Sequence, residues 1–224
     1  MLNSNHFAIY NHFIRVDKLP VYNGDCRIDW PDGSSYIGQF INNNIEGYGI
    51  YTFTDQAKYV GFWKNNIKHG IGTLYYPNGS KLQGEFRYDA PNGKGILYTV
   101  NDNESYLYVG NFINGSKYGF GKLYEIDSTS HELEYKLIYI GEFKKDRFSG
   151  KGIYYHSNGN IFYEGNWVDN LPFGNGLLYD INGSLKEVGY YIKGELQTKY
   201  EMEHANKIKR KLRNNIFFDF NYIE

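Results

Sequence analysis

Aromatic and apolar residues alternate with glycine and polar residues along much of the chain, at the two-residue period of a β-strand. In YVGFW (59–63), the odd-numbered positions carry Tyr, Gly and Trp, and they share one face of a strand. In GIGTL (70–74), the even-numbered positions share one face of the next run. Turn-forming segments such as KNN and PNG separate these runs. The pattern predicts short antiparallel strands joined by hairpins.

This unit recurs along the chain. Seven copies of a motif close to Tyr-x-Gly-x-Phe/Trp begin at Tyr36, Tyr59, Leu82, Tyr108, Tyr139, Tyr163 and Glu187. A Gly-x-Gly follows each of the first six, beginning at Gly47, Gly70, Gly93, Gly119, Gly150 and Gly174. The segment 24–33 superposes on 70–79 as a partial earlier copy, with Cys26 in place of a glycine. A period of this length indicates stacked repeats that bury a shared core.

The repeated Gly-x-Gly needs an explanation, because glycine weakens a strand interior. A phosphate-binding loop lies between a strand and a helix, and no helical pattern follows any of these pairs. Six equivalent copies therefore indicate a structural role, in which aromatic rings lie over the glycine backbone.

The motif Tyr-x-Gly-x-Trp/Phe-x6-Gly-x-Gly, repeated at about 23 residues over 24–191, resembles the MORN (membrane occupation and recognition nexus) repeat. The resemblance implies an all-β fold: an elongated single-layer antiparallel sheet of tandem β-hairpins, with a groove along it. Departures from the motif are Leu82 and Glu187 at the tyrosine position, Cys26, and a seventh copy that lacks a second strand with Gly-x-Gly. The family occurs in ciliary radial-spoke proteins, parasite cytoskeletal scaffolds and junctional membrane tethers, and as extensions on lipid kinases and a methyltransferase.

Three parts are expected: an N-terminal extension (1–23), the ladder of repeats (24–194) and a different C-terminal part (195–224). In the last part, Thr198 and Glu201 have the spacing of a capping box, and a helix is predicted over about 199–213. Its apolar stripe is Ala205, Ile208 and Leu212. The final segment 215–224 alternates as an apolar strand. The helix either caps the end of the ladder or binds a lipid or acidic partner.

Composition narrows the possible functions. The net charge of −1 provides no general attraction for nucleic acid, and the single cysteine excludes an internal disulfide and a thiolate zinc cluster. The six histidines are scattered, and no catalytic set, metal site or cofactor site is predicted. Glu142 and Glu164 fall at equivalent repeat positions and are interpreted as solvated. The sequence predicts a non-enzymatic cytoplasmic protein without a signal peptide or transmembrane helix, and leaves its oligomeric state open.

The first functional hypothesis is a scaffold or adaptor that docks a helical or extended segment of a partner protein, in a cytoskeletal or ciliary assembly. Tyrosines recur at one position of successive second strands, facing away from the glycines, and aliphatic residues of the first strands lie beside them. The predicted partner-binding residues are Tyr75, Tyr98, Tyr124, Tyr155, Tyr179, Ile37, Val60, Val109 and Ile140. The rival interpretation is that the chain's own tail covers these tyrosines.

The second hypothesis is a peripheral membrane tether that binds anionic phospholipid. The ladder from 36 to 191 carries 14 Lys and Arg against 16 Asp and Glu, so the basic helix is its only candidate site. The predicted lipid or acidic-partner residues are Lys207, Lys209, Arg210, Lys211 and Arg213.

Overall fold

The computed structural model describes residues 21, 23–101, 104–127 and 134–216. The predicted N-terminal extension, apart from residues 21 and 23, and most of the predicted C-terminal strand lie outside these residues. The strands are β1 (Gly24–Asp29), β2 (Ser35–Ile41), β3 (Asn44–Thr52), β4 (Lys58–Lys64), β5 (Ile67–Tyr75), β6 (Lys81–Arg87), β7 (Ala90–Val100), β8 (Ser105–Ile113), β9 (Ser116–Asp127), β10 (Glu134–Lys144), β11 (Arg147–Tyr155), β12 (Ile161–Val168), β13 (Leu171–Tyr179), β14 (Leu185–Ile192) and β15 (Glu195–Lys199). One helix follows, α1 (His204–Ile216).

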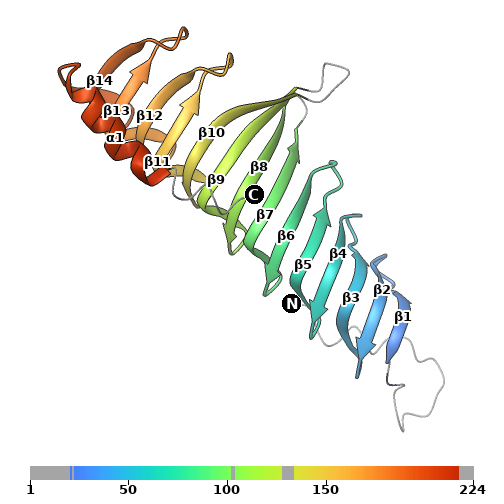
Figure 1. Ribbon diagram of the computed structural model, residues 1–224. Helices are drawn as coiled ribbons and strands as arrows, with labels where there is room; N and C mark the ends of the chain where they lie inside the picture. The colour runs from blue at the N-terminus through green and yellow to red at the C-terminus, as the bar shows by residue number, and fades with distance from the viewer. Residues whose placement is uncertain (1–20, 22, 102–103, 128–133, 217–224) are drawn as a thin grey trace. The chain divides into compact units, whose positions relative to one another are not determined.

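The strands form a single open antiparallel sheet in which the 15 strands follow one another in chain order (Figure 1). This confirms the predicted all-β fold of tandem hairpins. The described residues divide into two compact units. Unit 1 consists of the chain up to Pro77 together with residues 86–89, and it contains β1–β5. Unit 2 comprises 78–85 and the chain from Ala90 onward, so it holds β7–β15 and α1.

The hairpin turn within each repeat is two residues long. In the β4–β5 turn, Asn65 and Asn66 have φ of 49° and 65°, and in the β12–β13 turn, Asp169 and Asn170 have φ of 50° and 69°. Positive φ at both residues is the geometry that suits the twist of antiparallel strands, and Asn and Asp tolerate it well. The Asn and Asp residues of these turns thus explain why the chain reverses there.

The second turn residue also links neighbouring repeats. The Asn66 side chain accepts a hydrogen bond from the backbone N–H of Ile45 at 2.7 Å, and the Asn170 side chain does the same for Phe148. Each bond joins residues more than 20 positions apart, one repeat from the next. The sequence analysis did not predict this contact, although the recurring Asn or Asp at this position indicates it.

The Tyr and Gly residues form the buried face of the sheet, as predicted. Tyr59 is fully buried and lies over Gly61 of its own strand and Gly72 of β5, which are direct cross-strand partners. A Cβ added at Gly72 would overlap the Tyr59 ring and hydroxyl. The hydroxyl donates to the Phe62 carbonyl oxygen at 3.2 Å. Tyr36, Tyr108, Tyr139 and Tyr163 are buried in the same way.

The first glycine of each Gly-x-Gly has a different role from the one predicted. Gly70 has φ of 66° and lies where the β4–β5 register shifts, between the Gly61–Gly72 and Trp63–Lys68 pairs. An added Cβ there would meet only Phe62, at 3.5 Å. Gly70 therefore allows the left-handed backbone of a β-bulge and is not covered by a ring.

The repeats that are longer than the 23-residue period have longer strands. β7 has 11 residues, β9 has 12 and β10 has 11, against 7 to 9 in most others. β9 and β10 remain paired out to Asp127 and Glu134, which extends this hairpin. The tip at 128–133 lies outside the described residues.

The C-terminal end corrects two expectations. Thr198 lies in β15, where it pairs with Tyr190, so Thr198 and Glu201 form no capping box and α1 begins only at His204. The seventh copy has a second strand without Gly-x-Gly, and this strand, β15, lies beyond the predicted end of the ladder at 194. Because Glu187 replaces the usual tyrosine, Leu196 of β15 lies over Gly189 instead. The signal in the sequence was Leu196 two residues after a Lys-Gly turn.

Candidate functional site

The side of the sheet opposite the buried tyrosines, here called the second face, carries the predicted partner-binding residues. It includes the residues immediately before the glycine of each first strand and immediately after the second glycine of each second strand, together with the residues two positions away from them along the same strands. In β4 and β5 these residues include Val60 and Thr73, which are direct cross-strand partners. Tyr75, two residues further along β5, pairs with Lys58 on the same face.

The predicted tyrosines lie in different surroundings. Tyr75 is exposed, whereas Tyr98, Tyr124 and Tyr155 are half-buried and Tyr179 is buried. Burial raises the pKa of Tyr124 and, with a smaller contribution from the Glu164 charge, that of Tyr155. The structure therefore does not make these five side chains one uniformly exposed surface.

The predicted aliphatic residues also differ from repeat to repeat. Ile37 is exposed and Val60 and Val109 are half-buried, whereas Ile140 is buried. Ile140 belongs to a cluster with Phe120 and Ile153, against which Tyr155 packs. Phe120, the central residue of its Gly-x-Gly, is a second-face residue that sequence reasoning did not single out.

In unit 2, α1 covers part of this face (Figure 1). Ala205 and Leu212 are buried against Leu177 of β13 and Val188 of β14, and Tyr179 belongs to the same cluster. Ile208 packs at its edge. The predicted stripe of Ala205, Ile208 and Leu212 thus faces the sheet, and the rival interpretation that the tail covers the tyrosines holds for Tyr179.

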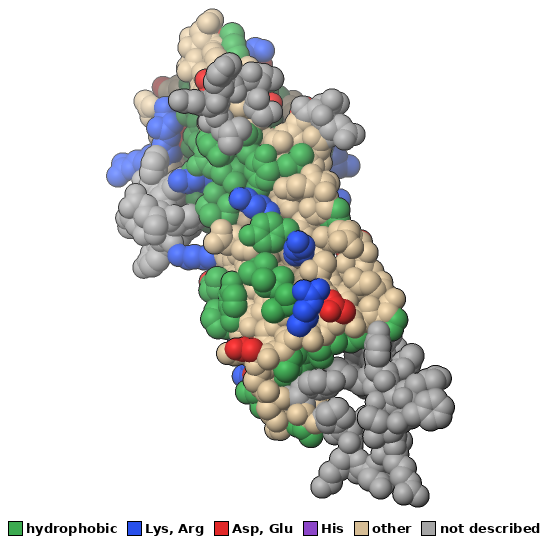
Figure 2. Space-filling view, turned by 90° about the vertical axis from the view of Figure 1, so that its right-hand side faces the viewer, with side chains coloured by type: hydrophobic (Ala, Val, Ile, Leu, Met, Phe, Trp, Pro, Cys, Tyr) green, Lys and Arg blue, Asp and Glu red, His purple; other side chains and the backbone are tan. Residues whose placement is uncertain are grey.

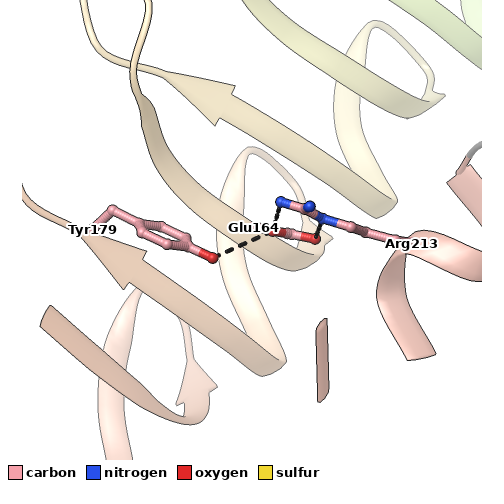
Figure 3. A network of polar contacts seen from close by, with 3 residues as sticks. All are labelled: Glu164, Tyr179 and Arg213. Atoms are coloured by element: carbon pink, nitrogen blue, oxygen red, sulfur yellow. Dashed lines mark hydrogen bonds and ion pairs between the residues drawn. The ribbon is translucent and has the colours of Figure 1, made fainter. Parts of the chain in front are cut away.

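An ion pair anchors α1 to the sheet (Figure 3). Glu164 of β12 is fully buried and accepts two hydrogen bonds from Arg213, from Nε at 2.8 Å and from Nη2 at 3.0 Å. The Tyr179 hydroxyl donates to the same carboxylate at 3.4 Å. The hydrogen bond to Glu164 raises the pKa of Arg213, and burial raises the pKa of Tyr179 to about 12. The expectation that Glu164 is solvated is wrong, because α1 packs over it. Glu142 is exposed, and the repeat alignment places it opposite Asn166, so it is not equivalent to Glu164 as expected.

The ion pair divides the basic residues of α1 into two sets. Arg213 binds Glu164, and the Lys209 ammonium lies 5.8 Å from the centre of the Tyr179 ring. Lys207, Arg210 and Lys211 are exposed. A shallow hollow between α1 and the sheet is lined in part by Lys151, Lys207 and Lys211. Two of the five predicted lipid-binding residues therefore face the sheet.

Comparison with known proteins identifies the repeats. Matches to the MORN repeat cover residues 36–58, 59–81, 83–104, 139–161 and 163–185, which together make up half of the chain. The chain belongs to the MORN repeat family. The copy that begins at Tyr108, in which the β9–β10 hairpin is extended, lies between the matched segments.

Alsin is similar to part of this MORN chain. Alsin from Rattus norvegicus, Mus musculus and Homo sapiens is 36% identical over 72 residues. The alignment covers 32% of this chain and 4% of each alsin. The chain therefore matches only a small part of those relatives.

MORN repeats generally mediate contacts with proteins or membranes, and proteins built from them are typically non-catalytic. Among the residues that the structure describes, no three His, Cys, Asp or Glu side chains gather into a possible metal site. No helix within this part of the chain is both long and apolar enough to cross a membrane. The second face and the exposed basic residues of α1 are accordingly the candidate binding surfaces.

Proposed function

We propose that this MORN protein is a non-catalytic scaffold or adaptor that docks a helical or extended segment of a partner protein on the second face. A cytoskeletal or ciliary assembly in the cytoplasm is the proposed setting, by analogy with other proteins that carry MORN repeats. A scaffold of this kind requires a binding surface on a fold that does not depend on the bound segment.

The docking of α1 in unit 2 is the observation that carries this proposal. The second face there holds an amphipathic helix through apolar contacts with Leu177 and Val188 and through the buried ion pair of Glu164 and Arg213. The opposite face of the sheet is filled by the Tyr and Gly core of the repeats. A partner segment would meet side chains of the same kind at the repeats that α1 leaves uncovered.

The tyrosine residues provide the test. Replacing Tyr98, Tyr124 and Tyr155 together with Ser should abolish capture of the protein that co-purifies with the wild-type chain, because truncating central aromatic residues commonly costs at least about 2 kcal/mol of binding free energy. The repeats should remain folded, since the Tyr and Gly face is unchanged. Partner capture and circular dichroism melting are measured on the same preparations.

Phe112 supplies the opposite control. It is buried against Tyr108 with a ring-centroid distance of 5.2 Å, so Phe112→Ser should unfold the repeats around it. Loss of both partner capture and folding in the triple tyrosine variant would contradict the proposal. That result would make the tyrosines part of the folded core.

Binding of anionic phospholipid is the second candidate function, and it is favoured by the three exposed basic residues Lys207, Arg210 and Lys211. Replacing all three with Gln should abolish sedimentation with phosphatidylserine vesicles at physiological salt, because basic residues near such a surface contribute about 1 kcal/mol each. Lys209→Gln is the matched control, since this side chain lies over the Tyr179 ring. Equal sedimentation of the triple variant and wild type would exclude α1 as the lipid site.

A further inference from the structure

The second face of unit 1 has a continuous group of exposed apolar side chains. Six residues of β2–β5 form this group, called here the unit 1 patch: Ile37, Tyr48, Ile50, Phe62, Ile71 and Tyr75. The strand register makes them neighbours: Ile50 is the cross-strand partner of Ile37 on one side and of Val60 on the other. Tyr48 pairs with Phe62, with ring centroids 5.5 Å apart. Exposed hydrophobic side chains also appear in groups on the side of the molecule drawn in Figure 2.

Several equivalent positions in unit 2 are buried, although Ile96, at the repeat position of Ile50, is 44% exposed. Ile37 and Ile50 are 45% and 37% exposed, whereas Ile140 and Ile153 at the same repeat positions are each 5% exposed. Leu177, which is equivalent to Ile50, is fully buried beneath α1. The unit 1 patch therefore exposes side chains of the same type as those that are buried at these positions in unit 2. A contiguous apolar surface of this kind marks an interaction site.

We infer that the unit 1 patch binds an amphipathic helix of a partner protein, through an uncharged apolar stripe. This inference rests on the proposed scaffold function and adds the place and the class of partner. The support for a helix is α1, which binds the second face of unit 2 through Ala205 and Leu212. None of the six side chains of the patch is charged, so the partner's stripe lacks the arginine by which α1 reaches Glu164.

Strand spacing gives the length of the partner helix. The three gaps between β2 and β5 amount to about 14 Å at about 4.8 Å each. A helix that crosses these strands needs about ten residues at about 1.5 Å each, and thus an apolar stripe of about three turns. α1 covers a similar set of strands in unit 2 with 13 residues.

The test uses a synthetic peptide with the sequence of residues 203–216, fluorescein-labelled, in which Leu replaces the residue corresponding to Arg213. Fluorescence anisotropy should show saturable binding to the full chain. The double variant Ile50→Asp/Phe62→Asp should weaken that binding at least about tenfold, the size expected for losing central apolar contacts. Because an isolated short helix is only partly formed, the ratio of affinities between variants is the measured quantity.

Tyr88→Asp is the matched control. Tyr88 is 79% exposed and lies in the β6–β7 turn outside the patch, with φ of 52°, which Asp tolerates. This variant should bind the peptide as the wild type does. A benzophenone group placed on the peptide should also crosslink to β2–β5 of the wild-type chain, which keeps the test valid if the double variant unfolds.

Several outcomes would overturn the inference: no binding to the wild-type chain, unchanged binding to the double variant in a folded state, or crosslinks confined to β11–β14. Sedimentation velocity that shows a dimer dissolved by Phe62→Asp would replace the partner helix with a second copy of the chain. If the peptide fails while the triple tyrosine variant still loses its partner, the inference falls and the proposed function stands.

Discussion

At Gly72, the ring and hydroxyl of Tyr59 occupy the space that any larger side chain would need. Gly61, its partner across the strands, lies under the same ring. At Gly70, two residues earlier, the backbone rather than the space requires glycine, because φ is 66°. The repeated Gly-x-Gly thus combines a bulge residue with a packing residue, and the two have different tolerances for substitution.

Gly72→Val should lower the free energy of unfolding by about 1–3 kcal/mol, because the new side chain forces the Tyr59 ring out of its place. Gly152→Val should do the same beneath Tyr139. Urea denaturation measures the change. Ile71→Val is the control, since Ile71 is exposed on the opposite face and the change should stay within about 0.5 kcal/mol. Equal stability of Gly72→Val and the control would show that the ring does not depend on the glycine.

Gly70→Ala should cost about 1–2 kcal/mol, because a non-glycine residue in the left-handed region is strained. Gly70→Asn should cost less, since Asn enters this region more readily. An added Cβ would meet no atom closer than 3.5 Å, so packing does not explain a loss at this position. The same urea series tests the order. A larger loss with Asn than with Ala would argue against the bulge geometry.

At the scale of elements, α1 is held by apolar contacts and by one buried charge pair. In the described ladder, the positions equivalent to Glu164 are Ile37, Val60, Gln83, Val109, Ile140 and Val188, so Glu164 is the one acidic residue among them. A buried ion pair is weak support for stability but can select one arrangement among similar ones. In a repeat protein, neighbouring repeats offer a helix similar docking positions. Glu164 distinguishes one of these positions from the others.

Arg213→Met should destabilise the docked helix by about 3–5 kcal/mol at most, because it leaves the Glu164 carboxylate buried without its ionic partner. Partial exposure of Arg213 reduces this loss, since its side chain is 33% exposed. The double variant Glu164→Gln/Arg213→Met should recover part of the stability. Hydrogen exchange of the α1 amides measures docking. Additive effects in the double-mutant cycle would contradict a direct interaction between the two residues.

At the scale of the whole molecule, the tyrosine core links stability to alkaline pH. Burial raises the pKa of Tyr36 and Tyr191 to about 12, from the ordinary value of 10.0, and raises the pKa of Tyr139 as well. The tyrosines of the unfolded chain therefore lose their protons at lower pH than the buried tyrosines of the folded chain. Between pH 10 and about 12, the unfolded chain binds fewer protons than the folded chain. Stability is fully present below pH 10 and decreases as the pH rises toward about 12.

Circular dichroism and phenolate absorbance, followed together during an alkaline titration, test this prediction. The buried tyrosines should ionise only as the β-sheet signal is lost. Tyr88→Phe is the control: Tyr88 is 79% exposed, so this change should leave the unfolding transition where it is in the wild type. Full ionisation of all tyrosines near pH 10 with an intact sheet would contradict burial of the core.

Local pattern determined much of this fold. The two-residue period, the Asn and Asp turns and the recurring Gly-x-Gly predict tandem hairpins, because contacts in an antiparallel sheet of consecutive strands join residues close in sequence. The stripe of Ala205, Ile208 and Leu212 likewise predicts which side of α1 faces the protein. These features need only neighbouring residues to be specified.

Only the tertiary structure decided the features that depend on contacts between distant residues or on small register shifts. The bulge that separates the roles of Gly70 and Gly72 arises from pairing with β4, and Leu196 replaces a missing ring only because β15 pairs with β14. Glu164 and Arg213 are 49 residues apart, so sequence spacing could not show that the glutamate is buried. The exposure of Ile37 and the burial of Ile140 at equivalent positions have the same cause, because identical local patterns receive different cover in the folded chain.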